Sequence, residues 1–292
     1  MQWKTDWGLR LRMFLTMFLL FALYVVFAAV IVSYIGGGIL VMALLFGGFS
    51  LVQYFFSDRL TLWSMGASEV SEGEYPELHA AVSRLSQQAD LPKPTVAVAD
   101  DKVPNAFATG RSQRKAAVCV TTGLLRTLDR EELEGVIAHE LAHIKNRDMM
   151  VMTLASFLST VAFIVVRWGA FFGGGRRRGG GGGVIVAIGV SLLVWVISYV
   201  LIRALSRYRE YAADRGGATI TGRPSALANA LLKISGEMDE IPTQDMRDEA
   251  EMNAFFIIPV SKGMISRLFS THPPTEKRVE RLRDLERQME AY

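Results

Sequence analysis

Five consecutive residues, His139-Glu140-Leu141-Ala142-His143, indicate the chemistry of this chain and the fold that must support it. Residues four apart on a helix lie about 40° apart around its axis, so on a helix both imidazoles can reach one metal ion. Glu140 can then hold a water molecule bound to that metal. In zinc peptidases with this pattern the histidines bind the metal and the glutamate acts as general base. Since the chain has four histidines, two of them flanking a glutamate by chance on a surface helix is disfavoured.

The surrounding residues predict the helix itself. Asp129 is suited to the N-cap, and Glu132 follows three residues later as its capping-box partner. Apolar residues then recur at helical spacing, at Leu133, Ile137, Leu141 and Ile144. One face of this helix is therefore expected to pack on a core while the histidines are presented elsewhere.

Hydrophobic residues make up 50% of the chain and are concentrated in four apolar runs, at residues 13–35, 39–56, 149–166 and 184–202. Each run is near the roughly 20 residues needed to cross a bilayer. A soluble core rarely contains four such runs, so the sequence predicts an integral membrane protein embedded in the lipid bilayer. The first run is long for a secretory signal and the second follows within a few residues, which favours an uncleaved anchor.

The runs divide the chain into alternating membrane and soluble parts. We predict two hydrophobic hairpins, at residues 1–57 and 149–202. The second hairpin contains a glycine- and arginine-rich loop at residues 173–183. A soluble domain is then formed from two separate segments, residues 58–148 and 203–292.

The positive-inside rule orients these parts. Lys4, Arg10 and Arg12 precede the first run and favour a cytoplasmic N-terminus. We therefore expect a multi-pass protein of the cell membrane, with both termini and the soluble domain in the cytoplasm. The loop basic residues 176–178 oppose this rule, and a second hairpin that dips into the bilayer from the cytoplasmic side would satisfy the same orientation.

The soluble segments predict an α+β fold, mainly helical with a small β-meander. Strands are expected at residues 95–99, 106–109 and 116–120. Helices are expected at 77–89, 203–214, 224–234 and 274–289, and an acidic, turn-rich surface excursion at 237–251.

Charge and cysteine content exclude other classes. The net charge of +3 is modest and no basic face alternates with aromatic residues, so no nucleic-acid partner is expected. The single Cys119 cannot form an intrachain disulfide and reads as a small buried hydrophobe, which suits a cytoplasmic domain.

Catalytic zinc requires three protein ligands and one open position, so the two motif histidines need a third partner. His79 and His272 are candidates, as is a carboxylate on a neighbouring helix. Glu210 and Asp214 are four residues apart and share a helix face. If both intervening apolar runs cross the bilayer, the chain returns to the side that carries the motif, and Glu210 is delivered there.

Four segments resemble the HtpX family of membrane metalloproteases, the heat-shock protease HtpX and its homologues. They are His139-Glu140-Leu141-Ala142-His143-Ile144-Lys145-Asn146-Arg147-Asp148, Arg207-Tyr208-Arg209-Glu210-Tyr211-Ala212-Ala213-Asp214, Asn105-Ala106-Phe107-Ala108-Thr109-Gly110 and Ser270-Thr271-His272-Pro273-Pro274. The order of apolar runs and motifs matches too, so the resemblance covers nearly the whole chain.

This resemblance implies a gluzincin-like zinc peptidase domain with one Zn²⁺ per chain. His139, His143 and Glu210 would bind the zinc and Glu140 would act as general base. The implied role is quality control in the cytoplasm, with misfolded or damaged membrane proteins as polypeptide substrates.

Further candidates surround this core. Asp214 is suited to accept from the far N–H of a zinc histidine, and Asp148 could do the same, although each also reads as a surface or membrane-boundary carboxylate. His272 could stabilise the oxyanion or simply enter a helix before two prolines. Asn105 and Ala106 open a strand that could pair with extended substrate, or form an ordinary turn after proline.

Two other functions remain open. A CAAX prenyl-protein endopeptidase would use the same chemistry on a lipidated substrate, but that family usually has more spans than the four counted here. A non-catalytic scaffold or transporter would hold a structural metal. Such a site is normally closed by a fourth ligand, commonly cysteine, and transporters place ionisable groups within their spans, which these runs almost lack.

Overall fold

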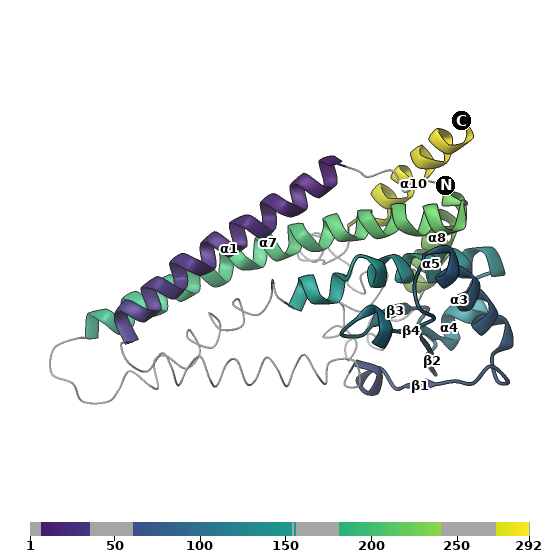
Figure 1. Ribbon diagram of the computed structural model, residues 1–292, viewed down its shortest axis with the longest axis horizontal. Coiled ribbons are helices and arrows are strands. Elements are labelled where there is room, and N and C mark those ends of the chain that lie inside the picture. The colour runs from purple at the N-terminus through teal and green to yellow at the C-terminus, as the bar shows by residue number, and fades with distance from the viewer. Residues whose placement is uncertain (1–6, 36–60, 154, 156–180, 241–272, 292) are drawn as a thin grey trace. The chain divides into compact units, whose positions relative to one another are not determined.

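The computed structural model describes residues 7–35, 61–153, 155, 181–240 and 273–291, and all elements below lie in these ranges (Figure 1). The helices are α1 (Trp7–Ile35), α3 (Pro76–Gln88), α4 (Thr122–Thr127), α5 (Arg130–Lys145), α7 (Gly181–Thr221), α8 (Pro224–Glu240) and α10 (Thr275–Glu290), and a 3-10 turn η2 spans Gln113–Lys115. The strands are β1 (Ala67–Glu69), β2 (Thr95–Ala99), β3 (Ala106–Thr109) and β4 (Ala117–Thr121). The described chain is thus mainly helical with one small sheet, as the sequence predicts.

The chain folds as two compact units. One unit comprises Met1–Thr5, Phe56–Met150 and Ser206–Tyr292, and the other comprises Asp6–Phe55 and Val151–Leu205. The histidine motif therefore belongs to the first unit, together with the C-terminal part of α7 from Ser206 onward. The predicted domain boundaries stay a prediction.

The sheet of the first unit has the strand order β1-β2-β4-β3, so the predicted meander is wrong. β2 is parallel to β4, β3 is antiparallel to β4, and β1 is an unpredicted antiparallel partner of β2. A meander assumes that strands consecutive in the chain pair with each other. The connection at residues 100–105 can extend about 20 Å, which is enough to carry the chain past one intervening strand.

Thr121, at the end of β4, fixes this crossing. Its Oγ1 donates to the carbonyl oxygen of Val103 at 2.8 Å and accepts from the N–H of Asn105 at 2.9 Å. Its own N–H donates to the carbonyl oxygen of Asn105 at 2.9 Å. The same hydroxyl accepts from the N–H of Leu124 and caps α4. One buried side chain therefore joins the crossover, the sheet and the next helix.

The main core of this unit lies between the sheet and the helices. Leu85 of α3, Val118 of β4, Ile137 of α5 and Leu231 of α8 share one cluster of buried side chains. The opposite face of the sheet is covered by a smaller cluster that contains Ala97, Ala99, Phe107 and Cys119. Because strand residues alternate between faces, both sides of this short sheet are buried.

The predicted start of α5 is confirmed. The carboxylate of Asp129 accepts from the N–H of Glu132 at 3.0 Å, and the carboxylate of Glu132 accepts from the N–H of Asp129 at 3.0 Å. Lys233 of α8 also donates to Glu132 at 2.6 Å, which ties the start of α5 to that helix. The N-cap signal in the sequence therefore places the histidine helix in register.

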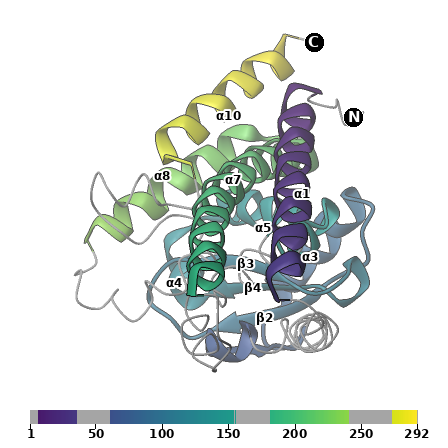
Figure 2. The ribbon, with the colours of Figure 1, turned by 90° about the vertical axis from the view of Figure 1, so that its left-hand side faces the viewer.

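The other predicted helices of the soluble segments are also present, as α3, α7, α8 and α10. α10 lies beside α8 (Figure 2) and buries Val279 and Leu282. α8 extends to Glu240, so the first four residues of the predicted acidic excursion are helical. The rest of that excursion lies outside the described residues.

The second unit contains α1, residues 151–153 and 155, and the N-terminal part of α7. Leu20, Tyr24 and Val194 belong to one buried cluster, and the Tyr24 hydroxyl donates to the carbonyl oxygen of Ala155 at 2.6 Å. Within the described residues one helix, Gly189–Thr221, is long and apolar enough to span a membrane, and residues 11–27 form a shorter apolar stretch. The second apolar run and most of the third lie outside the described part.

Candidate metal centre

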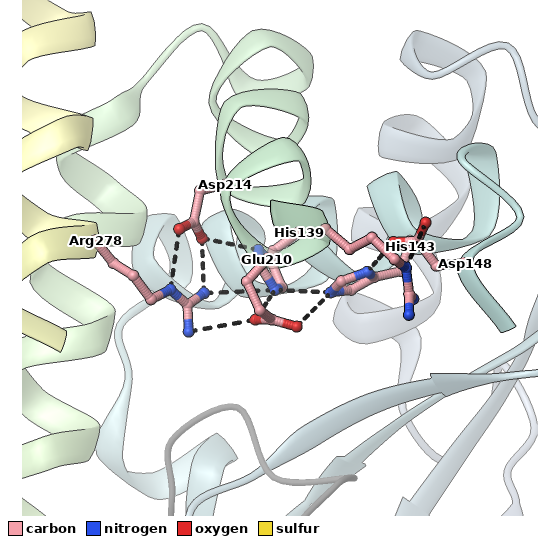
Figure 3. Close-up of polar contacts among 7 residues, drawn as sticks. His139, His143, Asp148, Glu210, Asp214 and Arg278 are labelled. Carbon is pink, nitrogen blue, oxygen red and sulfur yellow. Dashed lines mark hydrogen bonds and ion pairs between the residues drawn. The ribbon is translucent and has the colours of Figure 1, made fainter. Parts of the chain in front are cut away.

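Two helices bring three potential metal ligands together (Figure 3). His139 and His143 project from α5 and Glu210 projects from α7, and one ligand atom from each lies within 4.8 Å of the others. The two Nε2 atoms are 3.1 Å apart, and the carboxylate of Glu210 lies 3.6 Å from Nε2 of His139 and 3.5 Å from Nε2 of His143. Three potential ligand atoms therefore converge on one point.

A close approach of the two helices makes this convergence possible. Glu210, Asp214 and Gly217 recur at intervals of four and three residues and so share one face of α7. A Cβ atom added at Gly217 would lie 2.8 Å from the backbone nitrogen of His139. Only glycine permits this contact, because any side chain would push α7 away from α5.

Each histidine is held from behind by a carboxylate. Nδ1 of His139 lies 3.1 Å from Oδ1 of Asp214, and Nδ1 of His143 lies 2.6 Å from Oδ2 of Asp148. A neutral imidazole has one N–H, so donation from Nδ1 leaves the lone pair of Nε2 free for a metal. Both carboxylates that the sequence proposed for this position therefore lie within reach of a histidine.

Each of these carboxylates in turn contacts an arginine. Arg278 of α10 donates to both oxygens of Asp214, at 2.9 and 2.6 Å, and lies 3.6 Å from the carboxylate of Glu210. Nε of Arg209 lies 3.0 Å from Oδ1 of Asp148. Arg278 is 1% exposed, so the guanidinium balances carboxylates that are out of reach of water.

Arg278 was not among the site residues expected from the sequence, where residues 274–289 read as a charged helix with a narrow apolar stripe. Arg278 lies four residues before Leu282 and therefore shares the helix face that buries Leu282. An arginine on the apolar face of a helix is a signal that it meets a buried anion.

Glu140 lies beside the ligand cluster and is 5% exposed. Burial raises the pKa of its carboxyl group, and the two neighbouring histidines oppose that rise. The N–H of Ala108 in β3 donates to this carboxylate. A carboxylate with a raised pKa, held beside a potential metal, is suited to accept and return a proton near neutral pH.

The charge on His139 depends on its carboxylate neighbours. Burial by itself would lower the pKa of His139, but hydrogen bonds to Asp214 and Glu210 raise it to about 9. At neutral pH this imidazole is therefore protonated on both nitrogens and positively charged when no metal is bound. A metal ion would have to displace that proton before it could bind Nε2.

Comparisons with known proteins identify the family. The model of Peptidase family M48 matches residues 72–286. "Protease HtpX homolog 2" of Methanosarcina mazei is 54% identical over 291 residues, covering 99% of both chains. "Protease HtpX homolog" of Moorella thermoacetica is 56% identical over 298 residues, covering 99% of this chain and 98% of the relative. The chain belongs to the HtpX proteases of peptidase family M48. It is thus a metallopeptidase, a hydrolase of peptide bonds.

A less similar relative agrees with this family. "Protease HtpX homolog 1" of Streptomyces coelicolor is 47% identical over 289 residues, covering 96% of this chain and 94% of the relative. The solved structure of S. mikatae Ste24p covers 90% of this chain and 66% of that chain, with a TM-score of 0.46 and 18% identity, which is a weak likeness.

In this M48 peptidase, Asn105 and Ala106 lie at the start of β3, an outer strand of the described sheet. Asn105 pairs with Thr121 of β4, so in the alternating antiparallel pattern Phe107 and Thr109 also face β4. The backbone groups of Ala106 and Ala108 therefore point away from β4. The bond from Ala108 to Glu140 agrees with this alternation.

The structure does not bring every sequence candidate to the M48 site. His79 belongs to α3, where its Nε2 lies 3.0 Å from the carbonyl oxygen of Val70, and it is not part of the ligand cluster. His272 lies outside the described residues, so its suggested oxyanion role stays a prediction. Among the third-ligand candidates that the structure describes, Glu210 is the one beside both motif histidines.

Proposed function

We propose that this chain is a zinc-dependent endopeptidase of the cell membrane that cleaves misfolded or damaged membrane proteins. One observation carries the proposal: Nε2 of His139, Nε2 of His143 and the carboxylate of Glu210 converge beside the buried carboxylate of Glu140. Membership of the HtpX proteases favours this enzyme over a non-catalytic scaffold or transporter.

The donor set fits zinc. Two imidazole nitrogens and one carboxylate are a common ligand set of catalytic zinc, which keeps a fourth position open. Within the described residues no fourth histidine, cysteine or carboxylate joins the cluster of His139, His143 and Glu210. The carboxylates behind the histidines present Nε2 to the centre, which supports a site prepared for a metal.

Glu140 would carry the proton in the reaction. Zinc bound at this site would supply a Lewis acid that polarises the scissile carbonyl and makes a water molecule more acidic. Glu140 would accept the proton of the attacking water and return it to the leaving amine. Its raised pKa, which results from burial, matches a group that must hold a proton transiently. Asp214 and Asp148 would keep the two ligand histidines oriented.

The outer edge of β3 would bind substrate. An extended polypeptide could pair with the outward backbone groups of Ala106 and with the carbonyl oxygen of Ala108, while Asn105 fixes the start of the strand. Ala106 is 1% exposed and Ala108 is 9% exposed, so this edge must be uncovered before a substrate can pair. Pairing through the backbone would accept many sequences, as an enzyme that removes misfolded proteins requires.

A membrane location is supported by the apolar runs and by α7. The helix Gly189–Thr221 is long and apolar enough to span a bilayer, and α1 exposes the large apolar side chains Phe14, Phe18 and Phe21. The same helix α7 carries Glu210, so one continuous element includes both an apolar segment and a proposed metal ligand. A peptidase attached to the bilayer in this way is suited to substrates from the membrane.

Metal analysis paired with a proteolysis assay tests the proposal. The purified protein should contain one zinc per chain and cleave an unfolded test protein, and a chelator should abolish cleavage. Glu140→Gln should retain zinc but lose cleavage by about 100-fold or more, since the proton carrier is gone. Glu210→Ala should lose zinc itself. Absence of zinc from the active protein, or full activity of Glu140→Gln, would overturn the proposal.

A further inference from the structure

Arg209 forms a buried ion pair with Asp148, and the proposed reaction gives this arginine no role. Asp148 is 2% exposed and Arg209 is 7% exposed. Oδ1 of Asp148 contacts Nε of Arg209 at 3.0 Å, and Oδ2 contacts Nδ1 of His143 at 2.6 Å. The carboxylate therefore lies between an arginine of α7 and a histidine of α5 (the histidine and carboxylate are labelled in Figure 3).

A turn after α5 delivers Asp148 to this position. The helix ends at Lys145, and Arg147 adopts φ 56, in the left-handed region. Its N–H donates to the carbonyl oxygen of Ile144 at 3.1 Å. This reversal brings Asp148 back against the last turn of α5, beside His143. A left-handed arginine is an uncommon conformation, which indicates that the contacts around this turn hold it.

Arg209 precedes Glu210 directly on α7. Side chains of consecutive helix residues point about 100° apart around the axis, so these two reach different targets from one place. Glu210 reaches the Nε2 atoms of both histidines, and Arg209 reaches the carboxylate behind one of them. α7 thus contacts His143 from the metal-facing side directly and from the opposite side through Asp148.

We propose that Arg209 is a positioning residue for His143 and acts through Asp148. The arginine fixes the carboxylate, the carboxylate accepts the N–H of Nδ1, and the imidazole is held with Nε2 toward the metal. The pair also links α7 to the end of α5 without any metal, so the third ligand and the second histidine remain in register in the metal-free protein. This inference rests on the proposed metal site.

The guanidinium is required because of burial. The carboxylate of Asp148 is 2% exposed and has little water to stabilise its charge. Among the described residues its charged or chargeable contacts are the guanidinium of Arg209 and the imidazole of His143. Without Arg209 the buried carboxylate would lose the cation at its Oδ1 and could rotate away from His143 toward another donor.

Zinc affinity, measured by competition with a chelator on equal amounts of folded protein, tests this role. Arg209→Met and Asp148→Asn should each weaken zinc binding by about 10- to 100-fold, the usual effect of losing a residue that orients a metal ligand. If Arg209 acts through Asp148, the double variant should lose no more affinity than the weaker-binding single variant. Arg209→Lys, which keeps the charge, should retain most of the affinity.

Arg223→Met is the control for the loss of one positive charge, because Arg223 pairs with the exposed Glu131 and lies outside the cluster. It should bind zinc like the unmodified protein. Labelling the four histidines with ¹⁵N gives a second readout, since the Nδ1–H form of His143 should be less populated in Asp148→Asn and in Arg209→Met than in the unmodified protein.

The possible results separate this inference from the proposed function. If the unmodified protein binds no zinc, the proposed function fails. If it binds one zinc and the folded Arg209→Met and Asp148→Asn variants bind equally well, the positioning role fails alone. Additive losses in the double variant would also overturn it. If Arg209→Met does not fold, the other two variants decide. Weaker zinc binding in Asp148→Asn, with most of the affinity kept in Arg209→Lys, supports the positioning role. Unchanged zinc binding in Asp148→Asn overturns it.

Discussion

At the scale of single residues, the site is a set of alternating charges around two imidazoles. His139 contacts Asp214, which contacts Arg278. In the same way His143 contacts Asp148, which contacts Arg209. Each buried charge thus has an opposite neighbour, which is the condition under which buried ions are tolerated. The same pairs decide which nitrogen of each imidazole is presented to a metal.

The raised pKa of His139 predicts how metal binding depends on pH. The pKa is about 9 in the metal-free protein, so below pH 9 zinc must displace a proton from this imidazole. Apparent zinc affinity should therefore rise by about tenfold per pH unit between pH 6.5 and 8.5 and level off above pH 9. Chelator competition, corrected for protonation of the chelator, measures this slope, and a flat profile over that interval would contradict the prediction.

At the scale of elements, the distance between α5 and α7 sets the geometry of the ligands. Gly217 permits backbone contact with His139, and Gly135 of α5 makes a similar approach to α8, where an added Cβ would lie 2.9 Å from the nitrogen of Leu227. Two glycines thus allow α5 to lie tightly between neighbours. The metal site depends on this packing as much as on the ligand side chains.

Gly217→Ala should separate α7 from α5 and weaken zinc binding by at least about tenfold, because Glu210 is carried away from the histidines. Gly236→Ala is the matched control, since an added Cβ there meets no atom within 4 Å. The control should leave zinc affinity unchanged and stabilise α8 by up to about 1 kcal/mol. Zinc titration and thermal unfolding distinguish the two variants, and equal zinc affinity in both would exclude the packing argument.

The orientation of β3 predicts different effects for a proline substitution at two positions of the strand. Ala106→Pro removes an N–H that points away from β4, so it should lower kcat/KM on an unfolded protein by about tenfold, mainly through KM, and leave the sheet paired. Thr109→Pro removes an N–H that faces β4 and should mainly lower the unfolding temperature. Unchanged kinetics in a folded Ala106→Pro variant would rule out pairing of substrate at this edge.

At the scale of the whole molecule, the sequence predicts that both soluble segments face the cytoplasm. Gln87 of α3 and Arg287 of α10 are exposed and come from different segments. Gln87→Cys and Arg287→Cys should both resist a membrane-impermeant maleimide in intact cells and react after the membrane is opened. The native Cys119 gives little background, because it is 0% exposed and burial raises its pKa to about 12. Labelling of either variant in intact cells would contradict the predicted cytoplasmic orientation of that segment.

Local patterns were enough for several elements. The capping box of Asp129 and Glu132 and the apolar spacing after it predict α5. The apolar spacing of Leu78, Val82 and Leu85 predicts α3. These signals depend only on residues within one or two helical turns. The sheet order could not be predicted in this way, because Thr121 pairs with a loop 16 residues earlier in the chain.

The sequence by itself determined that two histidines and a glutamate share a helix. It also determined that a helix with Glu210 and Asp214 on one face follows an apolar run, and that the soluble segments are mainly helical with a small sheet. Tertiary structure alone decided the approach of Gly217 to His139, the arrival of Arg278 from α10 and the pairing of Arg209 with Asp148. The physical reason is range. Helix periodicity and caps act within a few residues, whereas buried charges find their partners only after distant segments pack and exclude water.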